Sequence, residues 1–170
     1  MPPVRSASPA DGVGQGGARV AVQWFVGTVV NKLDAKGRVS VPAGFRDCLK
    51  NQGNDGFFCV KSISGLRALT GFGNEEFKRQ SEALKPHNPL LDKAHAPRAH
   101  SIFGQARHMA FDDTGRCVLS ADLIAFLGLT EQVCFVGLGD VFEIWNPADV
   151  PEIADQRLET TRNEYDGSGA

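Results

Sequence analysis

Four positively charged residues gather around one predicted turn in the first half of the chain. They are Lys32, Lys36, Arg38 and Arg46. Ammonium and guanidinium groups bind phosphate oxygens, and an arginine can also form two hydrogen bonds with the edge of a guanine. Taken together, the four cations predict a basic strip that contacts DNA, whereas the turn by itself is also compatible with an ordinary hairpin whose charges are solvated.

The elements that position these cations follow from the hydrophobic pattern. Short apolar segments rich in β-branched and aromatic residues predict strands, and a Gly-containing turn separates the first two. Pro42 suits the start of a helix with one apolar face. The predicted order is strand, turn, strand, helix, strand and strand, at 24–30, 34–37, 39–41, 43–50, 57–61 and 66–70. The unit is therefore ββαββ, and a further helix is expected over 74–84.

The same pattern occurs a second time, 78 residues later. Residues 33–43 align without a gap on 111–121, with identical Asp, Gly and Arg in the turn. After the helix the offset is 76, which a loop difference of two residues explains. Since one ββαββ unit has little interior, the two copies are expected to pack together as an internal pseudo-dimer.

The second copy keeps the structural residues of the turn and loses most of its cations. Thr114 stands where the first copy has Lys36, and Ile124 where it has Arg46, whereas Arg116 matches Arg38. We therefore expect the first copy to supply most DNA contacts and the second mainly packing. Arg107 and Arg116 are candidates for secondary DNA contacts.

Charge is divided unevenly along the chain, although the net charge is only −2. Residues 25–108 hold 13 Lys and Arg against 7 Asp and Glu, whereas residues 109–170 hold 3 against 12. A split of this kind suggests that the first half meets a polyanion. A long acidic C-terminal helix beside an otherwise ordinary surface is the alternative explanation.

The composition also suggests how the 170 residues are divided. The first residues are rich in Pro, Gly and Ser, which favours a disordered tail. The expected regions are a tail over 1–22, a first repeat with its following helix over 23–84, a linker over 85–100, a second repeat over 101–147, and an acidic helix with a tail over 148–170. Pro-rich residues 85–97 of the linker are expected to be irregular.

Several classes of function find no support in the sequence. The four histidines lack the spacing of metal ligands, and the Gly-x-Gly segments lack the rest of a nucleotide-binding loop. There is no nucleophile elbow and no apolar run of roughly 20 residues. We therefore expect no enzyme activity, metal, cofactor, small-molecule substrate or membrane partner, and a place in the cytoplasm. The four scattered cysteines are expected to be buried, reduced residues.

These motifs together resemble the MraZ family of transcriptional regulators. The matching residues are Phe25-x-Gly27, Leu33-Asp34-x-Lys36-Gly37-Arg38-Val39-x-Val41-Pro42-Ala43-x-Phe45-Arg46, Ala106, Asp112-x-x-Gly115-Arg116 and Val136-Gly137-x-Gly139-Asp140-x-Phe142-Glu143-Ile144-Trp145. The resemblance implies an α+β, mainly β fold, in which tandem repeats form a swapped-hairpin, AbrB-like β-barrel pseudo-dimer with a helix after each repeat. It also implies a homo-oligomeric ring that binds double-stranded DNA on the nucleoid, at short direct repeats upstream of the division and cell wall gene cluster.

Two other functions remain compatible with these residues. One is an antitoxin of the same superfold, which binds a toxin as well as its operator; the duplication and the length of the chain argue against it. The other is an oligomeric scaffold whose basic half meets an acidic partner protein. Base preference separates the regulator from the scaffold, because only the regulator distinguishes DNA sequences.

Overall fold

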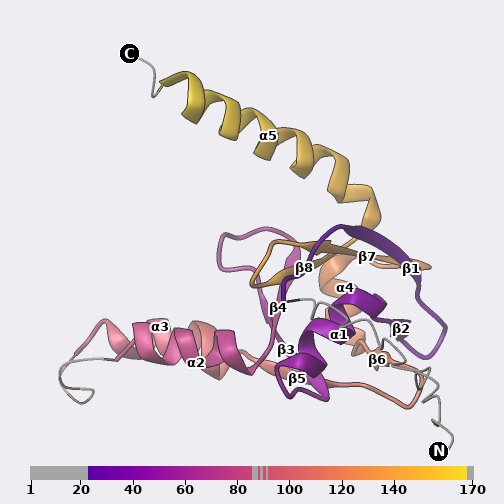
Figure 1. Ribbon diagram of the computed structural model, residues 1–170, viewed down its shortest axis with the longest axis horizontal. Coiled ribbons are helices and arrows are strands. Elements are labelled where there is room, and N and C mark those ends of the chain that lie inside the picture. The colour runs from indigo at the N-terminus through magenta and orange to yellow at the C-terminus, as the bar shows by residue number, and fades with distance from the viewer. Residues whose placement is uncertain (1–22, 86–87, 89, 91, 168–170) are drawn as a thin grey trace, which may run out of the picture.

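The computed structural model describes residues 23–85, 88, 90 and 92–167. The predicted disordered tail, 1–22, lies outside the described residues. Strands dominate the body of the molecule, so the expected α+β, mainly β class is confirmed. Figure 1 shows a body of strands and short helices from which one long helix projects.

The order of elements in the structure is ββαββ followed by a helix, twice over, as the repeat predicts. The first half contains β1 (Thr28–Lys32), β2 (Arg38–Ser40), α1 (Ala43–Asn51), β3 (Gly56–Lys61), β4 (Ala68–Phe72) and α2 (Asn74–Ala83). The second contains α3 (His95–Ala99), the π-helical turn η1 (His100–Gly104), β5 (Arg107–Ala110), β6 (Arg116–Val118), α4 (Ala121–Leu127), β7 (Gln132–Gly137), β8 (Phe142–Trp145), the 3-10 turn η2 (Pro147–Asp149) and α5 (Val150–Gly167).

Both sheets contain strands from the two repeats. The larger sheet has the order β1-β7-β8-β4-β3-β5, and β2 pairs with β6 in a separate ribbon of two antiparallel strands. The first strand of each repeat thus pairs with the other repeat, β1 with β7 and β5 with β3. Neither repeat therefore has a complete sheet of its own.

The strand registers are symmetric between the two repeats. Arg38 lies opposite Val118 and Ser40 opposite Arg116, so exchanging equivalent residues leaves the β2–β6 pairing unchanged. The same holds for β4 and β8, where Ala68 pairs with Trp145 and Leu69 with Ile144. This symmetry agrees with the offsets of 78 and 76 residues in the sequence.

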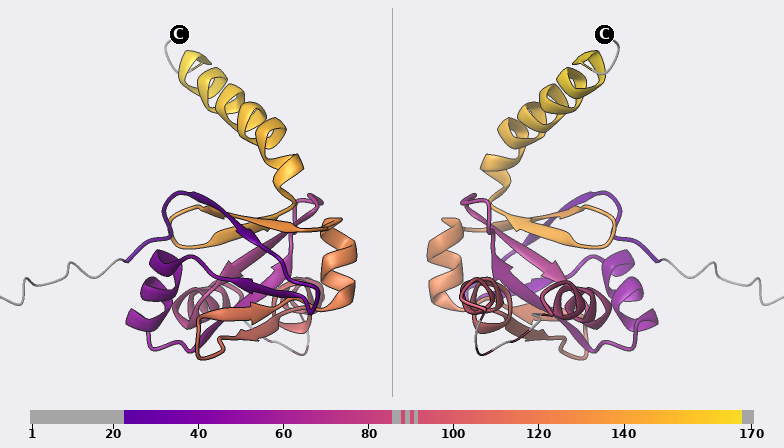
Figure 2. Two further views of the ribbon diagram at one scale, coloured as in Figure 1. Left: turned by 90° about the vertical axis from the view of Figure 1, so that its right-hand side faces the viewer. Right: turned by 90° about the vertical axis from the view of Figure 1, so that its left-hand side faces the viewer.

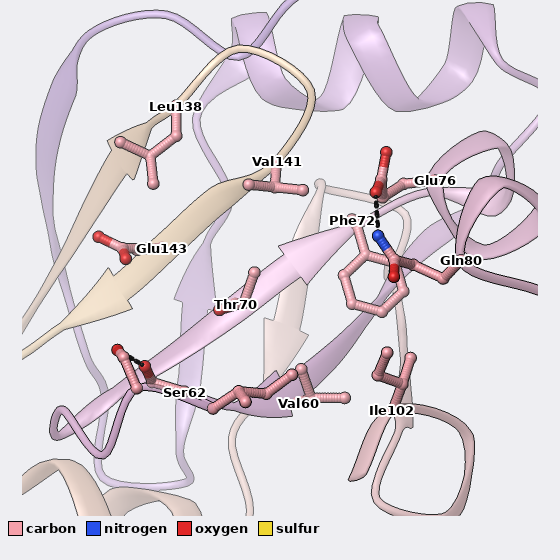
Figure 3. A pocket seen from close by; sticks show the side chains of 12 residues that line it. Val60, Ser62, Thr70, Phe72, Glu76, Gln80, Ile102, Leu138, Val141 and Glu143 are labelled. Atoms are coloured by element: carbon pink, nitrogen blue, oxygen red, sulfur yellow. Dashed lines mark hydrogen bonds between the residues drawn. The ribbon is translucent and has the colours of Figure 1, made fainter. Parts of the chain in front are cut away.

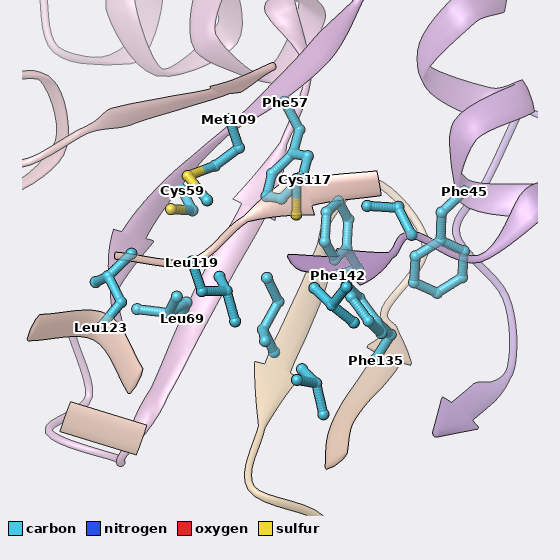
Figure 4. Packing of buried hydrophobic residues seen from close by; sticks show 14 of the residues in the cluster. Phe45, Phe57, Cys59, Leu69, Met109, Cys117, Leu119, Leu123, Phe135 and Phe142 are labelled. Atoms are coloured by element: carbon cyan, nitrogen blue, oxygen red, sulfur yellow. The ribbon is translucent and has the colours of Figure 1, made fainter. Parts of the chain in front are cut away.

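Phenylalanine rings from both repeats form the centre of the core. Phe142 lies between Phe25, Phe45 and Phe57, with ring centroids 4.8, 5.2 and 5.1 Å away. All four rings are buried. Figure 4 shows aliphatic and sulfur-containing side chains from both repeats beside these rings. Since the core is shared, its stabilisation comes from both repeats together.

The first strand begins later than the apolar pattern predicts. Residues 24–30 were expected to form one strand, but the backbone turns at Gly27, whose φ is 92°. Phe25 is joined to Gly139 by an isolated bridge, and the regular strand starts only at Thr28. A positive φ favours glycine and interrupts extended pairing, so the apolar run is divided in two.

The linker contains more regular structure than its prolines predict. Residues 85–97 were expected to be irregular, but α3 begins at His95 and η1 follows it directly. Pro97 is the third residue of α3, a position in the first turn where its missing N–H costs little.

The cysteine prediction is confirmed. Cys48, Cys59, Cys117 and Cys134 are all unpaired and buried. Burial raises the pKa of Cys59 and of Cys117 to about 12, so these thiols stay protonated near neutral pH. They act as small core residues.

The larger sheet has helices on one side and the two-stranded ribbon on the other. Figure 2 shows α2 and α3 on the first side and the β2–β6 ribbon on the second, with α5 pointing away from the body. Among the described residues, no helix has the length and apolar character needed to cross a membrane.

Replacement of Gly37 by alanine is expected to destabilise the fold more than the same change at Gly65. Both glycines have φ near 79°, but a Cβ at Gly37 would lie 2.6 Å from the carbonyl oxygen of Leu119, whereas Gly65 has open space. Gly65→Ala should lower the free energy of unfolding by about 1 kcal/mol, and Gly37→Ala by about 1–2 kcal/mol more. Urea denaturation measures both, and equal losses would contradict the close approach at Gly37.

Candidate nucleic-acid interface

An aspartate organises the turn that carries the predicted cations. The backbone N–H of Gly37 donates to the Asp34 carbonyl at 3.0 Å, and Gly37 has a φ of 78°. The Asp34 carboxylate accepts the backbone N–H groups of Lys36 and Arg38, both at 2.9 Å. Asp suits the first position of such a turn because its short side chain reaches the following N–H groups.

The second turn has the same hydrogen bonds. Asp112 accepts the backbone N–H groups of Thr114 and Arg116 at 2.9 Å, and Gly115 has the same φ of 78°. The Thr114 hydroxyl adds a bond of 2.8 Å to the Asp112 carboxylate. The geometry shared by the two turns explains why Asp, Gly and Arg are identical in the two repeats.

Each aspartate also holds the arginine at the end of its turn. Nε of Arg38 lies 2.6 Å from Oδ2 of Asp34, and Nε of Arg116 lies 2.9 Å from Oδ2 of Asp112. The described contacts engage only Nε, which leaves the two terminal nitrogens of each guanidinium for a ligand. Each carboxylate offsets the charge of its arginine, so these arginines offer oriented donors more than net positive charge.

Hydrogen bonds lower the pKa of both carboxyl groups. For Asp34 the largest cause is the backbone N–H of Arg38, joined by its guanidinium and by the N–H of Lys36. For Asp112 the largest cause is the backbone N–H of Arg116, joined by the Thr114 hydroxyl. Both groups therefore stay ionised at neutral pH and keep their arginines in place.

The β2–β6 ribbon brings Arg38 and Arg116 to one surface. Val39 and Cys117 are paired and buried, so their side chains point to the core. Because side chains alternate along a strand, Arg38 and Arg116 point to the opposite, outer face. The two arginines occupy diagonal positions across the ribbon, where Cα atoms are typically roughly 7–8 Å apart. The ribbon thus presents one arginine from each repeat side by side.

Lys32 and Lys36 are exposed beside this ribbon. Lys32 ends β1 opposite Gln132, and Lys36 lies in the first turn. Within the described parts of the chain, neither ammonium group has an ion pair or a side-chain hydrogen bond. Their charges are therefore available to a polyanion.

Arg46 reaches across to the other repeat. Its guanidinium packs against Gly115 in the turn of the second repeat. Its Nε donates to the Val41 carbonyl at 3.0 Å, and the side chain is half-buried. The equivalent residue, Ile124, packs against Gly37 in turn. Because the helices cross between repeats, the cations of the first repeat are distributed over both turns.

Arg107 forms an exposed, bidentate ion pair with Asp122. Its terminal nitrogens bind both carboxylate oxygens of Asp122 at 3.0 and 2.6 Å, and one also donates to the Ser120 hydroxyl. The Asp122 hydrogen bond raises the pKa of Arg107. Ser120 occupies the N-cap position of α4, and its hydroxyl donates to Asp122 without making a capping bond to the backbone. The Arg107 guanidinium is therefore already occupied by residues of its own repeat.

The sequence did not reveal this ion pair, because its partners have no counterparts in the first repeat. Residues equivalent to Arg107 and Asp122 are Val29 and Gly44 at the offset of 78. Among the described residues, no group of three or more His, Cys, Asp or Glu side chains could hold a metal ion.

Comparison with known proteins gives a consistent result. The model of a family described as "MraZ protein, putative antitoxin-like" matches residues 102–165. A protein named transcriptional regulator MraZ from Xanthobacter autotrophicus is 42% identical over 123 residues, which cover 72% of this chain and 77% of that protein. Its namesake from Rhodospirillum rubrum is 40% identical over 76% of this chain and 84% of the relative. For the one from Rickettsia bellii the identity is 35%, over 78% and 92%.

The two turn carboxylates are expected to make the fold sensitive to acid. Their folded pKa values lie below the ordinary 3.8, so the folded state binds protons less readily than the unfolded chain. Their contribution to stability is present above about pH 5 and is lost as the pH falls below about 4 toward the lowered pKa values. Tm, followed by circular dichroism, should therefore fall over this range, and fall less in an Asp34→Asn, Asp112→Asn double variant.

Asp113→Asn provides a matched control for this measurement. Asp113 lies in the second turn but makes no side-chain hydrogen bond to any described residue. The control should keep the acid dependence of the wild type. An acid profile of the double variant identical to that of the wild type would show that the turn carboxylates do not stabilise the fold.

Proposed function

Because the chain belongs to the MraZ family, we propose that it is a DNA-binding transcriptional regulator and not an enzyme. Relatives that are 35–42% identical to this chain, in alignments that cover most of it, are named transcriptional regulator MraZ. In this proposal it works in the cytoplasm, on the nucleoid, and binds short direct repeats in the promoter of the division and cell wall gene cluster. Double-stranded DNA and further copies of the chain are its partners.

We also propose that the two repeats form a swapped-hairpin, AbrB-like barrel that acts as an internal pseudo-dimer. The pairing of β1 with β7 and of β5 with β3 supports this arrangement. Residues 23–84 and 101–147 are then two halves of one unit, joined by the linker over 85–100 and followed by the acidic region over 148–170.

The observation that carries the proposal is the pair of held arginines on the outer face of the ribbon. Arg38 and Arg116 are each fixed through Nε by an aspartate, with their terminal nitrogens uncommitted to described residues. A side chain held in this way loses little conformational entropy when it binds a guanine edge or a phosphate. In this proposal the arginines read the DNA, and their pseudo-symmetry suits two adjacent positions.

Lys32 and Lys36 supply the charge that draws DNA to the ribbon. Both ammonium groups are exposed, and both belong to the first repeat. Phosphate contacts of this kind raise affinity without sequence preference. Arg46 contributes at the second turn, so that both turns carry a cation from the first repeat. Arg116 then stands beside Arg38 as a principal contact, and Arg107 is not assigned one.

The proposal is tested by measuring binding to the chain's own upstream promoter and to scrambled DNA at two salt concentrations. Arg38→Ala should weaken promoter binding by about 1–3 kcal/mol and reduce the preference for it. Lys36→Ala should weaken binding to both DNAs alike and lower the salt slope by about 1. Fluorescence anisotropy measures the promoter affinity, the preference over scrambled DNA and the salt slope.

Arg107→Ala serves as the matched arginine control, because its guanidinium is already engaged by Asp122. Its promoter affinity should stay within a factor of about two of the wild type. Equal binding of the wild type to both DNAs would favour a scaffold for an acidic partner. Loss of binding in Arg107→Ala equal to that in Arg38→Ala would contradict the role of the ribbon.

Arg46 combines a structural and an electrostatic role that two substitutions can separate. Arg46→Met keeps much of the apolar stem against Gly115 and removes the charge, whereas Arg46→Ala removes both. We expect Arg46→Met to lower DNA affinity with a smaller loss of Tm than Arg46→Ala. Anisotropy and thermal denaturation of both variants measure this, and unchanged DNA affinity in Arg46→Met would confine Arg46 to packing.

A further inference from the structure

The outer face of the β2–β6 ribbon carries two more side chains beside its arginines. Arg38 is paired with Val118, and Arg116 with Ser40. Paired residues of antiparallel strands point to the same face of the sheet, so Val118 and Ser40 share the outer face with the two arginines. Both are exposed. The outer face of the ribbon therefore consists of these four side chains.

The hydrogen-bond pattern of the ribbon brings each arginine close to its paired residue. Backbone hydrogen bonds join the residues that flank the ribbon, Gly37 with Leu119 at 2.7 Å and Val41 with Gly115 at 3.1 Å. Hydrogen-bonded and non-hydrogen-bonded pairs alternate along an antiparallel ladder, so both pairs that contain an arginine are of the second kind, in which facing Cα atoms are only about 4.5 Å apart. Each arginine and its paired residue can thus contact neighbouring base pairs, which are about 3.4 Å apart along DNA.

The two pairs differ chemically although they occupy equivalent places in the two repeats. Ser40 and Val118 match at the offset of 78 residues, as Arg38 and Arg116 do. The Val118 side chain is apolar and has no hydrogen-bonding atom. The Ser40 hydroxyl can donate or accept, and it has no hydrogen-bond partner among the described residues. The ribbon is therefore symmetric in its arginines and asymmetric in the residues paired with them.

Val118 is an apolar side chain in a charged and solvated place. It is 58% exposed. Another exposed apolar residue, Leu138, lines a groove of about 310 Å³ between the larger sheet and α2 (Figure 3). Val118 lies on the other side of that sheet, on the ribbon. Its apolar surface meets water in the free protein, so any apolar group that covers it adds to binding.

The major groove of DNA offers an apolar group that suits this position. The groove admits a two-stranded β-ribbon, and the 5-methyl group of thymine projects into it. Guanine presents O6 and N7 to an arginine on the same side of the base pair. A valine beside a guanine-binding arginine therefore matches a thymine next to that guanine. A serine in the same place tolerates either a donor or an acceptor on the neighbouring base.

We propose that Val118 contacts the 5-methyl group of a thymine next to the guanine bound by Arg38, whereas Ser40 sets no such requirement beside Arg116. The inference rests on the proposed binding of DNA by the ribbon. A two-fold symmetric protein matches a palindromic site, and the difference between Ser40 and Val118 removes that symmetry from the recognised sequence. A site of this kind has a direction, so it can be repeated head to tail, as the proposed direct repeats are.

The proposal is tested by replacing the thymines of the chain's own upstream promoter with deoxyuridine, one position at a time. Deoxyuridine keeps the base pair with adenine and lacks only the methyl group. Fluorescence anisotropy with the wild type should find a thymine next to a guanine at which the replacement weakens binding by about threefold to fivefold. Val118→Ser should bind the unmodified promoter more weakly by a similar factor and should be insensitive to deoxyuridine at that position.

Two variants are matched controls for this measurement. Ser40→Ala shortens the equivalent residue of the other pair, and Leu138→Ala removes exposed apolar surface on the other side of the sheet. Both should keep the deoxyuridine sensitivity of the wild type. Thermal denaturation confirms that each variant is folded.

Exchanging the two residues identifies the contact itself. Ser40→Val combined with Val118→Ser should abolish the sensitivity at the original thymine and create a preference for thymine over deoxyuridine at the position next to the other guanine. A wild type that prefers the promoter to scrambled DNA but tolerates deoxyuridine at every position would overturn this inference and leave the proposed function intact. So would full sensitivity at the original thymine in Val118→Ser or in the exchanged variant. A wild type without preference for the promoter would overturn both.

Discussion

The fold depends on the contact of each turn glycine with the strand end of the other repeat. The carbonyl of Gly37 accepts the N–H of Leu119 at 2.7 Å, and the carbonyl of Gly115 accepts the N–H of Val41 at 3.1 Å. Because glycine lacks a Cβ, the backbone of Leu119 can approach Gly37 and the Arg46 side chain can pack on Gly115. These two bonds flank the β2–β6 ribbon and place both aspartate-held arginines on it, so the proposed DNA surface and the shared core have one origin.

Much of this architecture could be predicted from the sequence, because it is repeated there. Identical Asp, Gly and Arg in both turns predicted matching hairpins, and the apolar spacing after Pro42 predicted α1 to within a residue. Local rules were enough for these elements. The same rules were wrong at two places. Gly27 interrupts the apolar run that was expected to form one strand, and α3 forms within the linker that was expected to be irregular.

The partners of individual cations could not be predicted in this way. Arg46 packs on Gly115 and Arg107 pairs with Asp122, and each contact depends on how chain segments cross in space. The division of charge between the halves of the sequence is likewise redistributed by the fold. Basic residues of the first half reach both turns, whereas α5, which points away from the body, carries five acidic residues against two basic ones.

The pairing of strands between the two repeats also has a consequence for synthesis on the ribosome. β1 is among the first elements to emerge, yet its partner β7 follows about one hundred residues later. The first repeat must therefore wait with an unpaired strand and an open core until nearly the whole second repeat has been translated. Contacts so distant along the chain slow folding and expose nascent chains to aggregation. The duplication also removes the need for two separate molecules to meet, because the second repeat always arrives on the same chain as the first.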